Sequence, residues 1–348
     1  MAPVILALRG EPWARARVLA TAQHRQMLDQ VLGLFAIDPD VDLDLMRPDQ
    51  ALADLTARMI GALDKALEQE QPDVVLAQGD TTTVLATGLA CFYRRIPFGH
   101  VEAGLRTGDL ANPFPEEMNR AVASRLARFH FAPTAASRAN LLKEGIPEAD
   151  IHVTGNTVID ALLQVAARNV PIGPALDDSK RLVLVTAHRR ESFGAPLREA
   201  FGALRTLADR NEDVEVLYPV HMNPNVSGPA RELLGGHQRI VLCDPLAYAP
   251  FVSAMKRAYL ILTDSGGVQE EAPALGKPVL VLREETERPE AVAEGVVKLV
   301  GTSADRILSE AQRLLDDPQA YAAMARGVSP YGDGHASERI VGVLKRAL

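Results

Sequence analysis

Hydrophobic residues recur along the chain in short runs, and most runs close on a polar or glycine-rich turn. Runs of this kind, rich in Val, Ile and Leu, are typical of parallel strands that are buried on both faces. Stretches with helical periodicity, such as 195–208, lie between the runs. The pattern predicts strands at residues 18–20, 74–76, 96–101, 129–132, 151–154, 182–185, 214–218, 240–242, 260–263, 279–282 and 297–300.

The repeated alternation of strand and helix patterns indicates two domains. A chain of 348 residues is too long for one compact core. We therefore expect an α/β fold with two Rossmann-like domains facing across a cleft, each a parallel sheet flanked by helices. The first domain is predicted at 1–168 and the second at 181–334, with a Pro-, Gly- and Asp-containing linker at 169–180. A final helical stretch is predicted at 335–348. It could belong to either domain, and one option is that it packs back on the first domain.

Composition and charge exclude several classes of protein. The chain is 47% hydrophobic and 24% charged, and no signal-like segment opens it. No apolar run approaches the roughly 20 residues that span a bilayer, so we expect a cytoplasmic protein without a membrane partner. The net charge of −8 argues against a nucleic-acid partner, because phosphate backbones need a basic face. Cys91 and Cys243 lie far apart in apolar surroundings, as reduced, packed thiols do.

Polar residues that follow predicted strands are candidates for a site, because ligands of open parallel sheets bind beyond the carboxyl ends of strands. In the first domain Asp80 follows one strand within a Gly-Asp-Thr-Thr-Thr segment, where it either points into the expected cleft or caps the next helix. Glu102 follows the next strand, and Glu116 opens a helix soon afterwards. Such carboxylates suit the abstraction and return of a proton. Glu117 is interpreted as a helix N-terminal or solvated residue.

In the second domain His188 follows the first predicted strand, with Arg189 and Arg190 beside it. A lone histidine is usually structural. Two neighbouring arginines at a strand end favour a role on a phosphate or a leaving group. His221 has a weaker case, and it could equally be a buried, hydrogen-bonded residue.

The strongest phosphate signal is the segment 263–271, which reads Thr-Asp-Ser-Gly-Gly-Val-Gln-Glu-Glu. It couples a strand to a glycine turn and a helix start, so main-chain N–H groups and the helix dipole can hold a diphosphate. Glu270 or Glu271 could then bind ribose hydroxyls. The segment matches neither the P-loop nor the dinucleotide fingerprint, so it indicates neither NAD binding nor ATP hydrolysis. We expect no cofactor and no metal.

With these clusters assembled, the chain closely resembles the non-hydrolysing UDP-N-acetylglucosamine 2-epimerases, whose fold is like that of the GT-B glycosyltransferases. The resemblance covers almost the whole chain, because eight motifs stand in the family's order. They lie at residues 23–26, 79–83, 100–107, 115–120, 188–191, 264–271, 286–290 and 331–334.

The resemblance implies an enzyme that interconverts UDP-N-acetylglucosamine and UDP-N-acetylmannosamine in two stages. UDP is eliminated to leave a bound 2-acetamidoglucal, and re-addition then returns a proton to the other face of carbon 2. The resemblance implies that Asp80, Glu102 and Glu116 act as acid or base. It implies that the departing diphosphate is stabilised by His188, Ser265, Gly266 and Gly267. Glu271 would contact the ribose, Arg288 the phosphate and Phe251 the uracil.

Bacterial members of this family also suggest an allosteric site for a second UDP-N-acetylglucosamine beside the active site. The positions that match substrate or allosteric contacts are Gln23, Gln26, Glu116, Arg120, Arg189 and His221. Asp49 stands where the family pattern has an arginine, and an acid there would weaken an anion site unless Arg47 substitutes. The resemblance further implies a homodimer and a role in supplying N-acetylmannosamine for surface polysaccharide.

The start of the chain departs from the family pattern. Members begin with a buried strand and a Gly-Thr-Arg-Pro-Glu-x-x-Lys loop, whereas this chain opens just after that loop. About five buried side chains at roughly 1.5–3 kcal/mol each would rival a whole domain stability of about 5–15 kcal/mol. We therefore expect the chain to fold poorly or lose activity, and we interpret Met1 as an internal methionine of a longer protein.

Three alternatives to the reversible epimerase are open. A hydrolysing epimerase would release free N-acetylmannosamine and UDP from the same kind of site. A GT-B glycosyltransferase is disfavoured, because inverting transfer does not need three strand-end carboxylates in one domain. A catalytically inactive UDP-sugar-binding protein would fit the missing loop.

Overall fold

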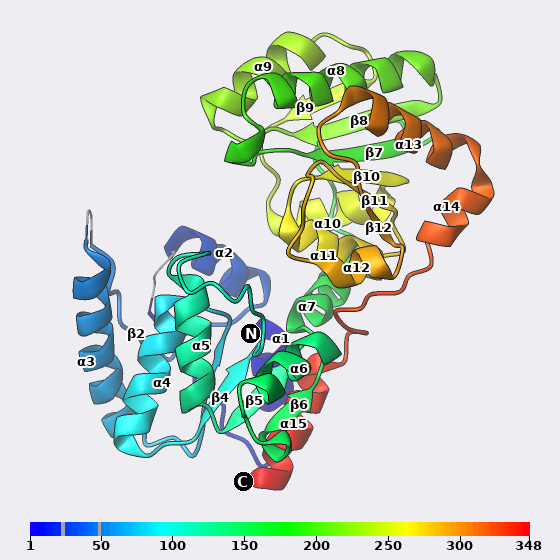
Figure 1. The fold of residues 1–348 in the computed structure, drawn as a ribbon. Coiled ribbons are helices and arrows are strands. Elements are labelled where there is room, and N and C mark those ends of the chain that lie inside the picture. The colour runs from blue at the N-terminus through cyan, green and yellow to red at the C-terminus, as the bar shows by residue number, and fades with distance from the viewer. Residues whose placement is uncertain (22–24, 48–49) are drawn as a thin grey trace. The chain divides into compact units, whose positions relative to one another are not determined.

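The computed structural model describes residues 1–21, 25–47 and 50–348, which divide into two compact units (Figure 1). Unit 1 comprises Met1–Ala161 and Tyr331–Leu348, and unit 2 comprises Leu162–Pro330. The border lies inside α7 (Thr157–Ala166), upstream of the predicted boundary at 168. The C-terminal helix belongs to unit 1. Residues 169–180, the predicted linker, form neither helix nor strand.

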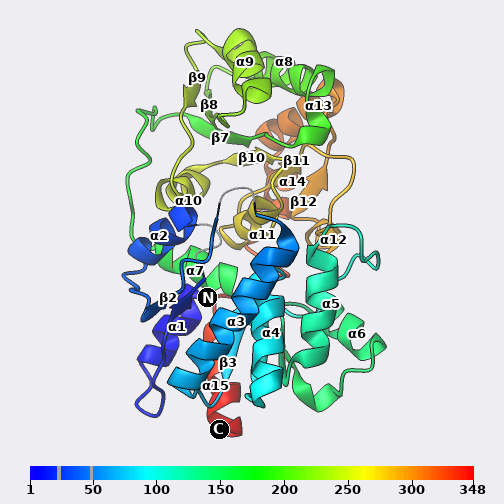
Figure 2. The ribbon, with the colours of Figure 1, turned by 90° about the vertical axis from the view of Figure 1, so that its left-hand side faces the viewer.

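Unit 1 alternates strands and helices (Figure 2). Its elements are α1 (Ala2–Arg9), β1 (Leu19–Ala20), α2 (Arg25–Leu34), β2 (Val41–Asp42), α3 (Leu52–Glu70), β3 (Val75–Gln78), α4 (Thr82–Arg94), β4 (Phe98–Val101), α5 (Glu116–Leu126), β5 (Phe129–Ala132), α6 (Ala135–Lys143), a short 3-10 helix (Glu148–Asp150), β6 (Ile151–Val153) and α15 (Ala336–Ala347).

The described strands of unit 1 form two parallel sheets, one ordered β3-β4-β5-β6 and the other pairing β1 with β2. Helices cover both faces of the larger sheet, because successive side chains of a strand point to opposite sides. Phe98 of β4 packs with Met59 of α3, whereas Val101 of the same strand packs with Ile340 of α15. This packing holds the carboxyl ends of β3 and β4, where the candidate residues begin.

Unit 2 contains the remaining elements. These are β7 (Arg181–Thr186), a short 3-10 helix (Arg190–Ser192), α8 (Ala195–Arg210), β8 (Val214–Pro219), α9 (Pro224–Leu234), β9 (Ile240–Cys243), α10 (Tyr248–Arg257), β10 (Leu260–Thr263), α11 (Gly266–Ala274), β11 (Val279–Val281), α12 (Pro289–Ala293), β12 (Val297–Leu299), α13 (Ala304–Asp316) and α14 (Pro318–Met324).

The sheet of unit 2 has six described strands, all parallel, in the order β12-β11-β10-β7-β8-β9. The order along the sheet reverses between β7 and β10, the first and fourth strands of the unit. This is the strand order of doubly wound Rossmann folds, which bind ligands beyond the carboxyl ends of strands at the point of reversal. The topology therefore identifies the ends of β7 and β10 as the place for a site.

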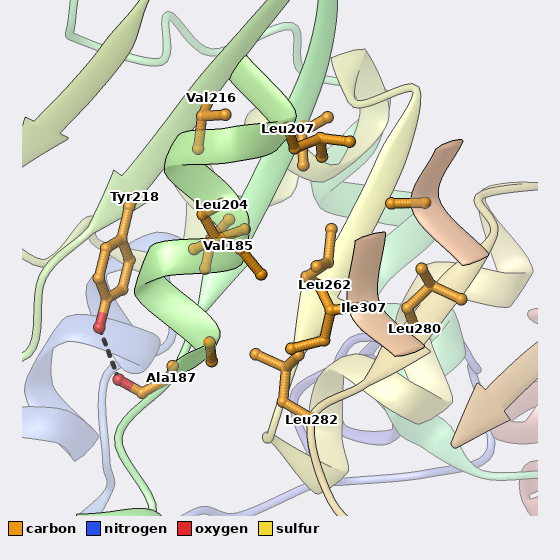
Figure 3. Packing of buried hydrophobic residues seen from close by; sticks show 14 of the residues in the cluster. Val185, Ala187, Leu204, Leu207, Val216, Tyr218, Leu262, Leu280, Leu282 and Ile307 are labelled. Carbon is orange, nitrogen blue, oxygen red and sulfur yellow. Dashed lines mark hydrogen bonds between the residues drawn. The ribbon is translucent and has the colours of Figure 1, made fainter. Parts of the chain in front are cut away.

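One face of this sheet is covered by α8, α9 and α13, whose apolar residues form a single cluster with the strands. Figure 3 shows part of this cluster, with Leu204 and Leu207 of α8 and Ile307 of α13 beside the strands. Leu204 of α8 is buried in this cluster with Val185 and Val216 of neighbouring strands. Burying a side chain of this size contributes about 1.5–3 kcal/mol. Tyr218 is also fully buried, and its hydroxyl donates to the carbonyl oxygen of Ala187 at 2.7 Å. That bond fixes the chain just after β7.

Every strand predicted from the sequence is present, with ends that differ by at most two residues. The sequence reasoning missed β2, because a strand of only two residues next to several aspartates has no apolar run. The α/β fold class with parallel, helix-flanked sheets is confirmed. Among the residues that the structure describes, no helix is long and apolar enough to cross a membrane.

Candidate functional site

Asp80 lies just after β3 and is held by α5. One of its carboxylate oxygens is 3.2 Å from the Arg120 guanidinium, and Asn119 donates to its main-chain carbonyl at 2.9 Å. The residue that caps α4 is Thr81, and its side chain makes no capping bond. The structure therefore gives Asp80 an ion pair with Arg120, and the capping position of α4 belongs to Thr81.

Glu102 directly follows β4 and adopts a left-handed backbone conformation with φ of +67°. Left-handed geometry is uncommon for a residue other than glycine and often accompanies functional turns. The half-buried carboxylate receives hydrogen bonds from the side-chain amides of Gln78, at 3.3 Å, and Asn156, at 3.5 Å. Glu116 is the first residue of α5 and is also half-buried.

Glu117 fits one of its two interpretations, the helix N-terminal one. It lies in the first turn of α5, as expected, but it is only 1% exposed and is not solvated. Its carboxylate accepts from the main-chain N–H groups of Thr107 and Gly108 at 3.1 and 3.0 Å, and it lies 3.3 Å from Arg120 Nε. Arg120 therefore bridges Asp80 and Glu117, and the bonds to Thr107 and Gly108 anchor the loop that precedes α5.

His100 is a buried neighbour of the Asp80 segment. Its Nε2 lies 2.7 Å from the carbonyl oxygen of Gly79. Burial lowers the pKa of His100 to about 4, because the interior disfavours the charged ring. A neutral imidazole is thus fixed beneath the turn that presents Asp80.

In unit 2 the two strand ends at the reversal point are joined by Asp264, which is 1% exposed. One oxygen, Oδ2, accepts from the main-chain N–H groups of His188 at 2.5 Å and Arg189 at 2.7 Å. The other, Oδ1, lies 3.2 Å from His188 Nδ1. His188 stands just beyond β7, at the position predicted for it.

Positive charge converges on the N-terminus of α11, which begins at Gly266 after the cap residue Ser265. A Cβ atom added at Gly266 would lie 3.8 Å from the Arg288 guanidinium and 4.0 Å from that of Arg189. The Nε atom of Arg189 is buried without a hydrogen-bond partner, while Arg288 forms an ion pair with Glu270. The main-chain N–H groups at the helix start, the helix dipole and two guanidiniums together make a site suited to a diphosphate.

Glu271 lies on the same helix, almost fully buried, and accepts a hydrogen bond from the hydroxyl of Tyr248. Burial raises the pKa of Glu271 to about 7; the Tyr248 hydrogen bond opposes this rise, and the nearby Glu270 charge adds to it. The sequence reasoning did not identify Tyr248, because nothing local marks a tyrosine in the first turn of α10 as a partner of α11.

The remaining candidate residues differ in their exposure. Phe251 is half-buried in α10. His221 is exposed, so the reading of it as a buried residue is wrong, and its ring stacks on that of His188 with centroids 5.5 Å apart. Gln26 lies in the first turn of α2, and Gln23 and Asp49 lie outside the described residues. Cys91 is buried, Cys243 is half-buried, and both are free thiols.

Comparison with known proteins identifies the family. The family model described as UDP-N-acetylglucosamine 2-epimerase matches residues 6–345. The chain belongs to this family. The Escherichia coli K12 UDP-N-acetylglucosamine 2-epimerase is 53% identical, over 99% of this chain and 94% of its own length.

Solved structures of the family agree with the fold. A UDP-GlcNAc 2-epimerase from Neisseria meningitidis, bound to UDP-GlcNAc, matches with a TM-score of 0.87 and 47% identity, over 99% of this chain and 96% of that one. The Methanocaldococcus jannaschii enzyme, in complex with UDP-GlcNAc and UDP, matches with a TM-score of 0.77 and 32% identity, over 99% and 95%. These matches confirm the GT-B-like fold prediction.

The same alignments bear on the expectation of an inactive or poorly folding chain. They run through nearly the whole of this chain at high identity and include the segments that carry the candidate residues. All the predicted strands are also formed in the structure. The expectation of inactivity therefore gains no support, and the chain is counted among the enzymes of this family.

Proposed function

We propose that this chain reversibly interconverts UDP-N-acetylglucosamine and UDP-N-acetylmannosamine by eliminating UDP with the carbon-2 proton, then adding UDP back while a proton is returned to the opposite face of carbon 2. The observation that most supports this reaction is the convergence of Arg189 and Arg288 on Gly266 at the start of α11. A leaving UDP needs its diphosphate charge stabilised as the glycosidic C–O bond breaks, and fixed donors provide this without reorganisation.

The proton transfers fall to carboxylates of unit 1. Removing the carbon-2 proton and returning one on the other face requires a base and an acid at fixed positions. Asp80, Glu102 and Glu116 are the candidates, and two of them are held by neighbours: Arg120 balances the charge of Asp80, and two amides orient Glu102. Glu271 with Tyr248 would hold the ribose, and Phe251 would pack near uracil.

The test is proton NMR of UDP-N-acetylglucosamine with the enzyme in heavy water. The proposal expects loss of the carbon-2 proton signal together with a manno product, and the reverse conversion when UDP-N-acetylmannosamine is supplied. Free N-acetylmannosamine and UDP, with no return to the gluco form, would instead identify a hydrolysing enzyme. If a folded protein that binds UDP introduces no deuterium at carbon 2 of the sugar, the mechanism is refuted.

Two sets of variants separate the steps. Asp80→Asn, Glu102→Gln and Glu116→Gln should lose deuterium incorporation while retaining UDP binding measured by calorimetry. Arg288→Met should lose UDP binding. Glu294→Gln is the matched control for Glu102→Gln and Glu116→Gln, because it makes the same chemical change at an exposed carboxylate of unit 2.

We also propose, on family membership, that the enzyme acts in the cytoplasm as a homodimer, supplies N-acetylmannosamine for polysaccharide, and is activated by a second UDP-N-acetylglucosamine. Light scattering tests the dimer. Initial rates of the reverse reaction, with and without added UDP-N-acetylglucosamine, test the activation.

A further inference from the structure

The two carboxylate oxygens of Asp264 have different neighbours. Two main-chain N–H groups occupy Oδ2 and fix the plane of the carboxylate, so Oδ1 is left facing His188 Nδ1 at 3.2 Å. The two residues are 76 positions apart in sequence, and the parallel pairing of Thr263 with Thr186 brings them together. Oδ1 is buried and has no hydrogen-bond partner. A carboxylate oxygen can only accept, so the nearby imidazole can satisfy it only by donating from Nδ1.

We propose that Asp264 is a positioning residue for His188: it holds a proton on Nδ1 and thereby directs Nε2 toward the departing diphosphate. The proposal rests on the proposed function, because it assumes that His188 contacts the leaving group. A carboxylate that fixes both the orientation and the tautomer of a histidine is a general device of acid–base sites.

The surroundings of the ring fit this role. The His188 side chain is 39% exposed, so part of the imidazole remains accessible to a ligand while Nδ1 faces the buried carboxylate. The ring of His221 lies nearly parallel to it, with an interplanar angle of 10° and ring centroids 5.5 Å apart. When the imidazole is protonated, Nδ1–H donates to Asp264 and Nε2–H can donate to a phosphate oxygen, and the buried carboxylate balances the added charge.

A purely structural role makes a different prediction. If Asp264 only ties the end of β10 to the segment after β7, its replacement should act independently of the His188 side chain. Asp264→Asn separates the two roles. The asparagine oxygen can still accept from the two main-chain N–H groups, but its amide would donate to Nδ1 and move the imidazole proton to Nε2.

The first measurement is the tautomer, from NMR of protein labelled with ¹⁵N-histidine, with the His188 signals assigned by their loss in His188→Asn. We expect the Nδ1–H form in the parent and the Nε2–H form in Asp264→Asn. Tyr218→Phe is the matched control, because it removes a hydrogen bond to the same segment without touching the ring, and it should leave the tautomer unchanged. A parent His188 protonated on Nε2 would overturn the proposal, whether or not any variant folds.

The second measurement is a double-mutant cycle on the rate of deuterium incorporation. Asp264→Asn should lower kcat about 10- to 100-fold in the parent, as expected for losing a hydrogen bond to a charged group. It should cost less than about 3-fold in a His188→Asn background, because residues that act through one another are not additive. Equal losses in both backgrounds would refute the proposal. The NMR result does not depend on turnover, so failure of the proposed reaction would be recognised separately.

Discussion

Replacing Glu271 by glutamine should stabilise the protein at neutral and alkaline pH. The carboxylate is 7% exposed, and burial raises its pKa from an ordinary 4.5 to about 7. Below pH 4.5 the group is protonated in both the folded and the unfolded chain, so it has no effect on the free energy of unfolding. As the pH rises to about 7, the unfolded chain ionises first, and stability is therefore lost across this window.

The size of the effect follows from the pKa difference. At 1.36 kcal/mol for each pKa unit, the ionised carboxylate costs the folded state about 3 kcal/mol above pH 7. Glutamine has nearly the same shape, stays neutral, and can still accept the Tyr248 hydrogen bond. For a domain of this size about 3 kcal/mol corresponds to an increase in Tm of roughly 6–12 °C.

The assay is thermal unfolding followed by circular dichroism at pH 5, 6, 7 and 8. The difference in Tm between Glu271→Gln and the parent should widen from pH 5 to pH 7 and level off by pH 8, whereas Glu294→Gln, at an exposed site, should show no such trend. UDP affinity should fall in Glu271→Gln, because the ribose contact weakens. A Tm difference that is flat or negative across this range would refute the reasoning about burial.

Three further predictions concern other parts of the structure. Gly104→Ala should prevent folding, because the new Cβ would lie 2.3 Å from a carbonyl oxygen of α6. Gly108→Ala has a similar positive φ but open space around it, so it should lower soluble yield and Tm much less than Gly104→Ala does. Arg288→Met should lower Tm by several degrees as well as UDP affinity, because the buried Glu270 loses its ion pair with Arg288. His100→Gln should make stability less sensitive to acid. The folded pKa of about 4 lies below the ordinary 6.5, so the parent loses up to about 3 kcal/mol of unfolding free energy as the pH falls through this window. Urea unfolding of parent and variant at pH 4.5 and 7 would detect the difference.

The sequence alone determined most of the secondary structure and the locations of the candidate residues. Strands buried on both faces produce short runs of Val, Ile and Leu, a signal that is local and needs no knowledge of the fold. The positions of Asp80, Glu102, His188 and the glycine turn at 265–267 followed directly, because each comes just after such a run. The family motifs then assigned roles to them that no pattern of burial could supply.

The pairing of these residues was decided only by the tertiary structure. Asp264 joins His188 because β7 and β10 are neighbours in the sheet, an order that no local pattern encodes. Of the two interpretations of Glu117, helix N-terminal or solvated, only the second fails, because the preceding loop folds over the carboxylate and no local pattern encodes that contact. Burial and charge balance depend on contacts between segments far apart in the chain, so the raised pKa of Glu271 and the convergence of Arg189 and Arg288 could be found only once the chain was folded.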